Sequence, residues 1–191
     1  MRIGVIAEGP TDVPVFEELI LKIHPQVTKV VVRPGRGKPS FLSVFPPLLW
    51  TFEYVEPGGR PEKAIVIRDA NGDDPTAVEG TLAKALTGRR VPPFHAGVRF
   101  HATRRETETW LLADVGAINR VAARYGGGAV AAIPGPLEDI VDAKEQFIRL
   151  LANAGLPNVP EIVREVTREV ALAVLRLHCP RFKDFEAKVL Q

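Results

Sequence analysis

The stretch that decides the fold is residues 2–12, which have the sequence RIGVIAEGPTD. Residues 2–7 are short, rich in Ile and Val, and soon followed by Gly9-Pro10, a pattern that predicts a buried strand stopped by a turn. Thr11 or Asp12 is suited to cap a helix after that turn. The segment therefore predicts a strand, a tight turn and a helix in succession.

The same alternation continues along the chain. Apolar segments at residues 27–32, 63–68 and 97–102 predict three further strands, and segments with helical patterns separate them. Strands that alternate with helices favour a parallel sheet covered by helices on both faces. We therefore expect an α/β fold with a parallel sheet of about four strands flanked by helices.

The second half of the chain has no strand pattern and is expected to be helical. A run of glycines at residues 126–128 marks a boundary between an α/β core, residues 1–125, and a helical C-terminal extension, residues 126–191, packed on that core. Besides the helix that follows the first strand, we expect helices along the whole chain. These are residues 41–52, kinked or split at Pro46-Pro47, and residues 74–86, 106–125, 140–154, 161–177 and 182–190.

Composition narrows the setting. The chain of 191 residues fits one domain, or one domain with a small appendage. Its single cysteine, Cys179, cannot form an internal disulfide, which favours a reducing compartment. No apolar run reaches the ~18 residues of a membrane span. We therefore expect a cytoplasmic protein without a membrane partner; the net charge of +2 is too small to indicate nucleic-acid binding by itself.

Acidic residues gather where two of the predicted strands end. Glu8 and Asp12 follow the first strand, and Asp69, Asn71 and Asp73 follow the third. The carboxyl ends of parallel strands share one edge of a sheet, so these side chains are expected to meet there. Several carboxylates without paired bases repel each other, and a divalent cation removes that repulsion. Oxygen ligands of this kind predict a site for Mg²⁺ or Mn²⁺.

A purely structural interpretation competes with the metal site. Residues 69–74, DANGDD, are also typical of a turn, and Asp12 could serve only as a helix cap. The spacing is not that of an EF-hand, because Asp74 stands at position six and Gly80 at position twelve. Glu8 is harder to explain by structure alone, since it directly follows five apolar strand residues and caps no helix of its own.

Basic residues form several small groups that are candidates for contact with a nucleic-acid backbone. The alternative is that each group is a set of solvated loop charges. The loop after the second strand is expected to lie beside the acidic edge, because it leaves the sheet at the same end. The candidate phosphate contacts are Arg33, Arg36, Lys38, Arg68, Arg104 and Arg105.

Three segments of the sequence resemble motifs of the Toprim family. Residues 5–12, VIAEGPTD, resemble its first motif, a Glu-Gly signature that closes the first strand, and residues 66–73, VIRDANGD, resemble its Asp-x-Asp motif. Residues 108–114, ETWLLAD, resemble a Glu-x-Trp-Leu-x-Ala-Asp motif of small stand-alone Toprim proteins of unknown function, relatives of the OLD-family and RloB-like nucleases. Segments 142–145 and 179–185 resemble that set too, so the likeness spans nearly the whole chain.

The resemblance implies a role for each matching residue. Glu8 resembles the Toprim catalytic glutamate, a metal ligand or general acid/base, and Asp69 resembles a Mg²⁺ ligand. The second Asp of the Asp-x-Asp motif is replaced by Asn71, so the resemblance implies weaker metal binding unless Asp73 or Asp12 substitutes for it.

The third motif and the segment after it supply further candidates. Glu108 and Asp114 resemble ligands for a second ion; their structural alternatives are a first helical turn and a solvent face. Lys144 resembles the basic residue that stabilises phosphate charge in OLD-type sites, and its alternative is an ordinary surface lysine.

The function that the resemblance implies is metal-dependent cleavage of phosphodiesters in DNA or RNA, within phage defence and with an ABC-type ATPase as a partner. One alternative is a degenerate Toprim module that binds nucleic acid or a partner ATPase without cleaving. A second is a receiver-like phosphoacceptor, which also gathers acidic residues after strands one and three. It requires a lysine after a fifth strand, and the sequence shows no such strand.

Overall fold

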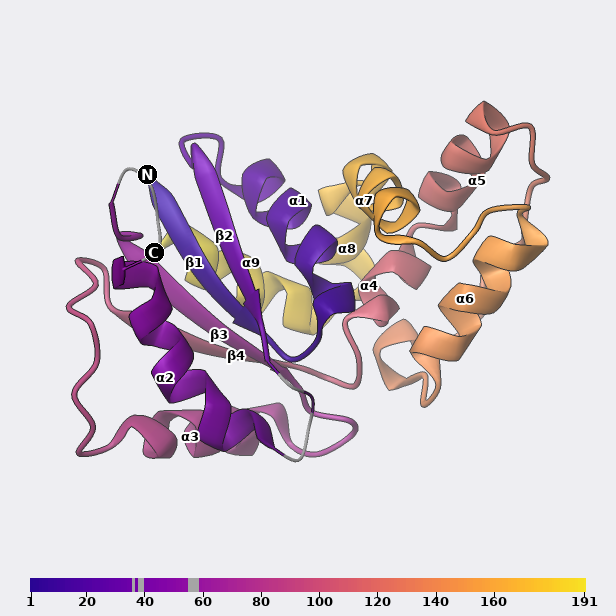
Figure 1. The fold of residues 1–191 in the computed structure, drawn as a ribbon. Coiled ribbons are helices and arrows are strands. Elements are labelled where there is room, and N and C mark those ends of the chain that lie inside the picture. Colours follow the sequence, from indigo (N-terminus) through magenta and orange to yellow (C-terminus); the bar gives the residue numbers. More distant parts are fainter. Residues whose placement is uncertain (36, 38–39, 55–58) are drawn as a thin grey trace.

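The computed structural model is an α/β protein whose helices cover both faces of a four-stranded parallel sheet (Figure 1). It describes the whole chain except residues 36, 38, 39 and 55–58. The strands are β1 (Arg2–Ala7), β2 (Lys29–Pro34), β3 (Lys63–Asp69) and β4 (Val98–Thr103), and they lie in the order β2-β1-β3-β4. The predicted fold class is therefore confirmed, and each strand lies within two residues of its predicted start.

The helices alternate with these strands and then continue alone. Short 3₁₀ helices at Pro10–Asp12 and Leu137–Asp139, within the described part of the chain, accompany the α-helices. The α-helices are α1 (Val13–Ile23), α2 (Phe41–Tyr54), α3 (Pro75–Leu86), α4 (Glu108–Ala113), α5 (Val115–Arg124), α6 (Ala143–Asn153), α7 (Pro160–Glu169), α8 (Leu172–His178) and α9 (Pro180–Leu190).

The sheet is apolar on both faces, as its parallel strands require. Alternate residues of β1 and β3 enter two separate cores: Val5 and Ile65 pack with α1 and the C-terminal helices, whereas Ile6 and Val66 pack with α2 and α3. Gly4 of β1 faces the second core, where an added Cβ would lie 3.0 Å from the ring of Phe52. The sheet therefore leaves only its edges available for a site.

The helix α2 is continuous through Pro46-Pro47, so the prediction of a split at this point is wrong. Each proline removes a backbone donor from the helix. Phe45 and Leu49 are fully buried against the sheet, and Phe41 stacks on Phe45 at a centroid distance of 5.7 Å. This burial holds the segment helical despite the missing hydrogen bonds.

The predicted helix 106–125 is in fact two helices, α4 and α5, because Asp114 interrupts it. One oxygen of Asp114 accepts a hydrogen bond from Ala117 N at 3.1 Å, which caps α5, and the other accepts from Ala171 N at 2.9 Å. Ala171 lies just before α8, where the predicted helix 161–177 is also broken in two. One buried carboxylate therefore serves both helix breaks.

Among the described residues, Lys63 joins α9 to the sheet and Lys22 joins α7 to α1. Lys63 of β3 is fully buried and donates to the backbone carbonyls of Lys188 (3.0 Å) and Val189 (2.6 Å) near the end of α9. Lys22 of α1 donates to the carbonyl of Arg168 at 2.6 Å, at the end of α7. Cations suit the carboxyl ends of helices, where carbonyls lack partners.

The predicted division of the chain into a core, residues 1–125, and a helical extension, residues 126–191, stays a prediction.

Among the described residues, no helix is both long and apolar enough to cross a membrane.

Candidate functional site

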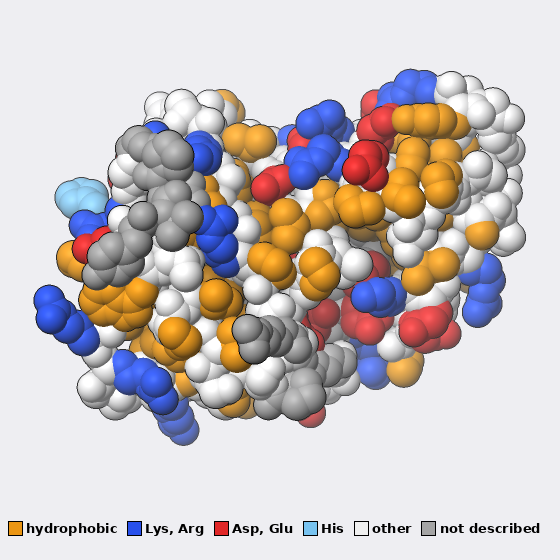
Figure 2. Space-filling model, viewed as in Figure 1, with side chains coloured by type: hydrophobic (Ala, Val, Ile, Leu, Met, Phe, Trp, Pro, Cys, Tyr) orange, Lys and Arg blue, Asp and Glu red, His pale blue; other side chains and the backbone are white. Residues whose placement is uncertain are grey.

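An acidic pocket opens at the carboxyl edge of the sheet, where the neighbouring strands β1 and β3 end. Figure 2 shows red Asp and Glu side chains gathered beside a blue Lys or Arg side chain in the hollow between the sheet and the α5–α6 part of the molecule. The pocket has a volume of about 340 Å³. Its described lining residues are Glu8, Gly9, Pro10, Thr11, Asp12, Gly37, Asp69, Glu106, Glu108 and Lys144.

Glu8 is placed in this pocket by the end of β1, which it directly follows. Its side chain is 9% exposed, and one carboxylate oxygen lies 3.9 Å from Nε of Arg68 in the neighbouring strand β3. The backbone oxygen of Glu8 accepts a hydrogen bond from Gly37 N at 3.3 Å. Gly37, in the loop after β2, therefore lies at the pocket, beside the acidic edge where the sequence predicts that loop.

Asp69 is the last residue of β3 and is held by two threonines. Its Oδ1 accepts hydrogen bonds from Oγ1 of Thr103 at 2.9 Å and from Oγ1 of Thr107 at 3.2 Å. Burial raises the pKa of Asp69 well above its usual value, and the charges of Asp12, Glu108 and Glu8 add to that effect. The four carboxylates therefore interact electrostatically across one pocket.

Asp12 does not act as a side-chain cap of the helix it precedes. Its Oδ2 accepts a hydrogen bond from Gly9 N at 2.9 Å, and no side-chain cap bond to α1 is formed. Burial raises the pKa of Asp12 to about 6, with Glu8 and Glu106 contributing, while the Gly9 hydrogen bond and Lys144 lower it. Asp12 therefore makes no cap bond to α1, and its bond to Gly9 N is part of a capping box at the short 3₁₀ helix Pro10–Asp12.

Glu108 begins α4, and Lys144 lies in the first turn of the neighbouring helix α6. Burial raises the pKa of Glu108 to about 7, helped by Asp12 and opposed by Lys144. The loop before α4 fixes the start of α6, because Oε2 of Glu106 accepts a hydrogen bond from Lys144 N at 3.0 Å. Glu108 and Lys144, although 36 residues apart in sequence, therefore face the same space.

The donor chemistry of this pocket fits a hard cation such as Mg²⁺ or Mn²⁺. Its candidate ligands are carboxylate oxygens, which such ions prefer. Among the described residues, no three His, Cys, Asp or Glu side chains are arranged to hold a metal ion as they stand. Mg²⁺ keeps several waters and takes one or two carboxylates together with substrate phosphates, so carboxylate donors of this kind fit its chemistry.

Asn71 and Asp73 lie in an exposed turn, outside the described lining of the acidic pocket. Asn71 has a positive φ of 54°, and its Nδ2 donates to the backbone oxygen of Asp69 at 2.9 Å. Asp73 N donates to the carbonyl of Ala70 at 3.0 Å. The structure thus brings Asp69 to Glu8 and places the other two residues of this segment in the turn.

Asp114 also lies outside the described lining of the pocket, although the same motif contributes Glu108. It is 8% exposed, so the prediction of a solvent face is wrong. Its oxygens are engaged by the two backbone amides at the helix breaks and by Arg120 at 3.4 Å. These bonds give Asp114 a structural role at the junction of α5 and α8.

The four described candidate phosphate contacts lie outside the described lining of the acidic pocket. The guanidinium of Arg33 lies 5.7 Å from the ring centre of Phe52, and Arg68 pairs with Glu8. Arg104 pairs with Asp139 at 3.3 Å. Arg105 packs beside Gly72, where an added Cβ would lie 2.9 Å from its Nη1. The two remaining candidates, Arg36 and Lys38, fall outside the described residues.

The sequence interpretation missed the residues that hold the acidic groups in place. Thr103 and Thr107 flank the end of β4, and Glu106 lies between them. Their position in the chain could have indicated them, because they lie at or just after the end of β4, at the same edge of the sheet as the ends of β1 and β3. Their partners lie 34 to 38 residues away in sequence, so no local pattern indicates them.

The raised pKa values predict that cation binding weakens in acid, because a bound ion must displace protons from Asp12 and Glu108. Below about pH 6 these groups hold their protons. We expect the affinity for Mn²⁺, measured by calorimetry, to rise steeply between pH 5.5 and 8, and the variant Glu108→Gln to flatten that rise.

The metal-free protein gives the matching stability result. The folded state binds these protons more tightly than the unfolded chain, so this contribution to stability is full below about pH 4 and is lost as the pH rises through 6 and 7. Relative to wild type, Glu108→Gln should gain on the order of 2 kcal/mol in unfolding free energy between pH 4 and 8. Denaturant melts that show a constant difference would contradict the assignment.

Comparisons with known proteins add a likeness of overall shape. No protein-family model matches the sequence, and no curated protein matches it. The C-terminal region of the Xanthomonas campestris pv. campestris OLD protein matches with a TM-score of 0.45 at 13% identity, over 99% of this chain and 98% of that chain. The C-terminal region of the Burkholderia pseudomallei OLD protein matches with a TM-score of 0.43 at 15% identity, over 96% of this chain and 98% of that one.

Proposed function

We propose that this protein cleaves phosphodiester bonds of DNA or RNA with the help of Mg²⁺ or Mn²⁺ bound in the acidic pocket. The observation that carries the proposal is the convergence of Glu8, Asp12, Asp69 and Glu108 on one pocket that also contains Lys144. The Toprim resemblance of the segments that supply these residues supports the same chemistry. The proposed ligands are the carboxylates, and Asn71 is not among them.

A bound divalent ion supplies charge neutralisation on the phosphate and lowers the pKa of a bound water. The protein's own groups do the rest. Asp69 is held in one orientation by Thr103 and Thr107, so it can position the ion without rearranging. Glu8, buried beside the ion site, is the proposed acid/base group. Lys144 of α6 lines the same pocket and is proposed to contact the phosphate.

The test of this function begins with the purified protein alone. We expect supercoiled DNA or single-stranded RNA to be cut in the presence of Mg²⁺ or Mn²⁺ and to stay intact in EDTA. If neither is cut, even when an ABC-type ATPase partner is supplied, while nucleic acid still binds, the chain is a binding module.

A receiver-like phosphoacceptor is not proposed. The described sheet has four strands and ends at β4, so no fifth strand carries the lysine that this chemistry requires.

A further inference from the structure

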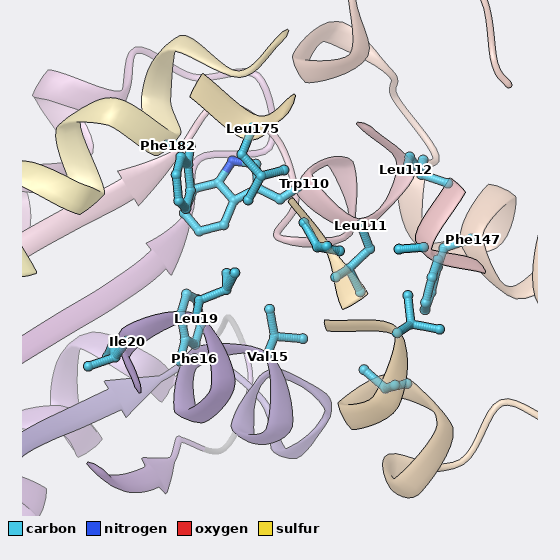
Figure 3. Close-up of a cluster of buried hydrophobic side chains, with 14 of the residues drawn as sticks. Val15, Phe16, Leu19, Ile20, Trp110, Leu111, Leu112, Phe147, Leu175 and Phe182 are labelled. Carbon is cyan, nitrogen blue, oxygen red and sulfur yellow. The ribbon is translucent and has the colours of Figure 1, made fainter. Parts of the chain in front are cut away.

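An apolar recess adjoins the acidic pocket and has no part in the function proposed above. It lies between α1, α4, α6 and the start of α7. Figure 3 shows three of its side chains, Val15, Leu111 and Phe147, within the buried cluster that α1, α4 and α6 share. Its described lining residues are Thr11, Asp12, Val15, Thr107, Glu108, Leu111, Lys144, Phe147, Ile148, Asn158, Val159, Pro160 and Val163.

The recess and the acidic pocket are continuous. Thr11, Asp12, Glu108 and Lys144 line both of them. A ligand with a phosphate in the pocket would therefore place its next chemical group at the entrance of the recess. The ammonium of Lys144 stands at this junction, where it can meet the phosphate from one side.

The walls of the recess restrict what that group can be. Seven aliphatic or aromatic side chains form most of the surface, and the exposed amide of Asn158 offers an NH₂ donor group and a carbonyl acceptor. The space open to the centres of water molecules is about 70 Å³. At roughly 10–15 Å³ for each water, the recess could hold about five waters. This is room for a flat heterocycle with a few polar edge atoms, and too little for a helix or strand of a protein.

The mouth of the recess is also apolar. Ile148 and Val159 are 37% and 38% exposed, although both are large hydrophobic side chains. A planar ring can pack against these two side chains, as bases do on the apolar surfaces of proteins that bind single strands.

We propose that the recess receives one unpaired nucleobase of the strand whose phosphate lies in the acidic pocket. This inference rests on the proposed function and names its substrate class, a single strand or a strand with a displaced base. A base inside a duplex is stacked on both sides and has to leave the helix before a pocket can enclose it. The protein should therefore bind single strands in preference to blunt duplexes.

The test compares two small ligands that differ only in the base, thymidine 3′,5′-bisphosphate and deoxyribose 3′,5′-bisphosphate, by calorimetry with Ca²⁺ present. We expect the wild type to bind the nucleotide about tenfold more tightly than the sugar bisphosphate. Ile148→Asn and Val159→Asn should lose this preference and keep the affinity for the sugar bisphosphate. Both sites are exposed, so neither change should unfold the protein.

The matched control is Val141→Asn. Val141 is 71% exposed and lies just before α6, outside the described lining of the recess. Equal affinity of the wild type for the two ligands, or no binding of either, overturns the inference, and so does a loss of preference in the control. A base preference that persists in a protein that cuts nothing contradicts only the proposed cleavage. Cleavage without a base preference contradicts only the recess.

Discussion

Glu8→Gln is expected to leave the protein folded and to lower the rate of phosphodiester cleavage by about 10²-fold or more, the usual scale for a positioned acid/base group. Glutamine has nearly the same shape as glutamate, so it fills the same space after β1. It carries no charge and takes up no proton, so it neither neutralises the ion nor transfers a proton in the transition state.

The measurement is nicking of supercoiled DNA and cleavage of RNA with Mg²⁺ and Mn²⁺, with folding followed by circular dichroism. Glu145→Gln is the matched control, because Glu145 is an exposed glutamate in the first turn of α6 and lies outside the described lining of the acidic pocket. Equal cleavage by wild type and Glu8→Gln would place the chemistry elsewhere, even if the protein is an enzyme.

The variant Glu8→Gln should also change the pKa values of the neighbouring carboxyls. This change distinguishes an effect of Glu8 on metal binding from an effect on the reaction. The charge of Glu8 raises the pKa of Asp12 and of Asp69. Removing that charge should lower both values, and the pH at which a metal binds should fall accordingly. A metal-binding curve that moves to lower pH while cleavage is lost would show that Glu8 acts on the reaction as well as on the ion.

The fold could be predicted from the sequence because its signals are local. A strand of five or six apolar residues followed by a turn and a helix is visible at residues 2–12 without any knowledge of the rest of the chain. In a parallel sheet, this order of elements also fixes which strand ends meet. The meeting of Glu8 with Asp69 follows from that rule and needs no knowledge of side-chain packing.

The missed features depend on contacts between distant segments. The break between α4 and α5 looks like continuous helix in sequence, since Asp114 is an ordinary polar residue in a helical pattern. Its partner Ala171 lies 57 residues further along the chain. The same holds for Glu106, whose bond to Lys144 N sets the position of α6, and for the apolar recess, which needs four helices to enclose it.

The turn at residues 69–74 shows where one sequence pattern has two meanings. Asp69 enters the site and Asp74 caps α3 by accepting a hydrogen bond from Thr76 N at 3.1 Å. Between them, Asn71 adopts the left-handed backbone that this residue type tolerates. The turn interpretation therefore holds for residues 71–74, and the metal interpretation stays a prediction for Asp69.

Lys144→Met is expected to lower cleavage by about 10²-fold, the scale seen when one preorganised group that stabilises transition-state charge is removed. Lys144 is the only cation among the described residues that line the acidic pocket. Methionine keeps much of the aliphatic stem, so contacts with the recess should persist while the charge is lost. Lys144→Arg should retain part of the activity, because it keeps the charge.

Lys144 has two possible modes of action, and pH separates them. Its charge lowers the pKa of Asp12 and of Glu108, so its loss should raise both values and move metal binding to higher pH. If that were its whole contribution, Lys144→Met would regain wild-type cleavage near pH 9, where the carboxyls are ionised without help. We expect cleavage to stay low at pH 9 with saturating Mn²⁺, because a missing phosphate contact is not restored by deprotonation.

The control for this experiment is Lys183→Met, since Lys183 is an exposed lysine of α9 outside the described lining of both the pocket and the recess. It should cleave like the wild type at every pH. Full recovery of Lys144→Met at pH 9 would reduce Lys144 to an electrostatic aid for metal binding. Wild-type cleavage by Lys144→Met at neutral pH would make it an ordinary surface lysine, and the phosphate would then have to be met by the ion alone.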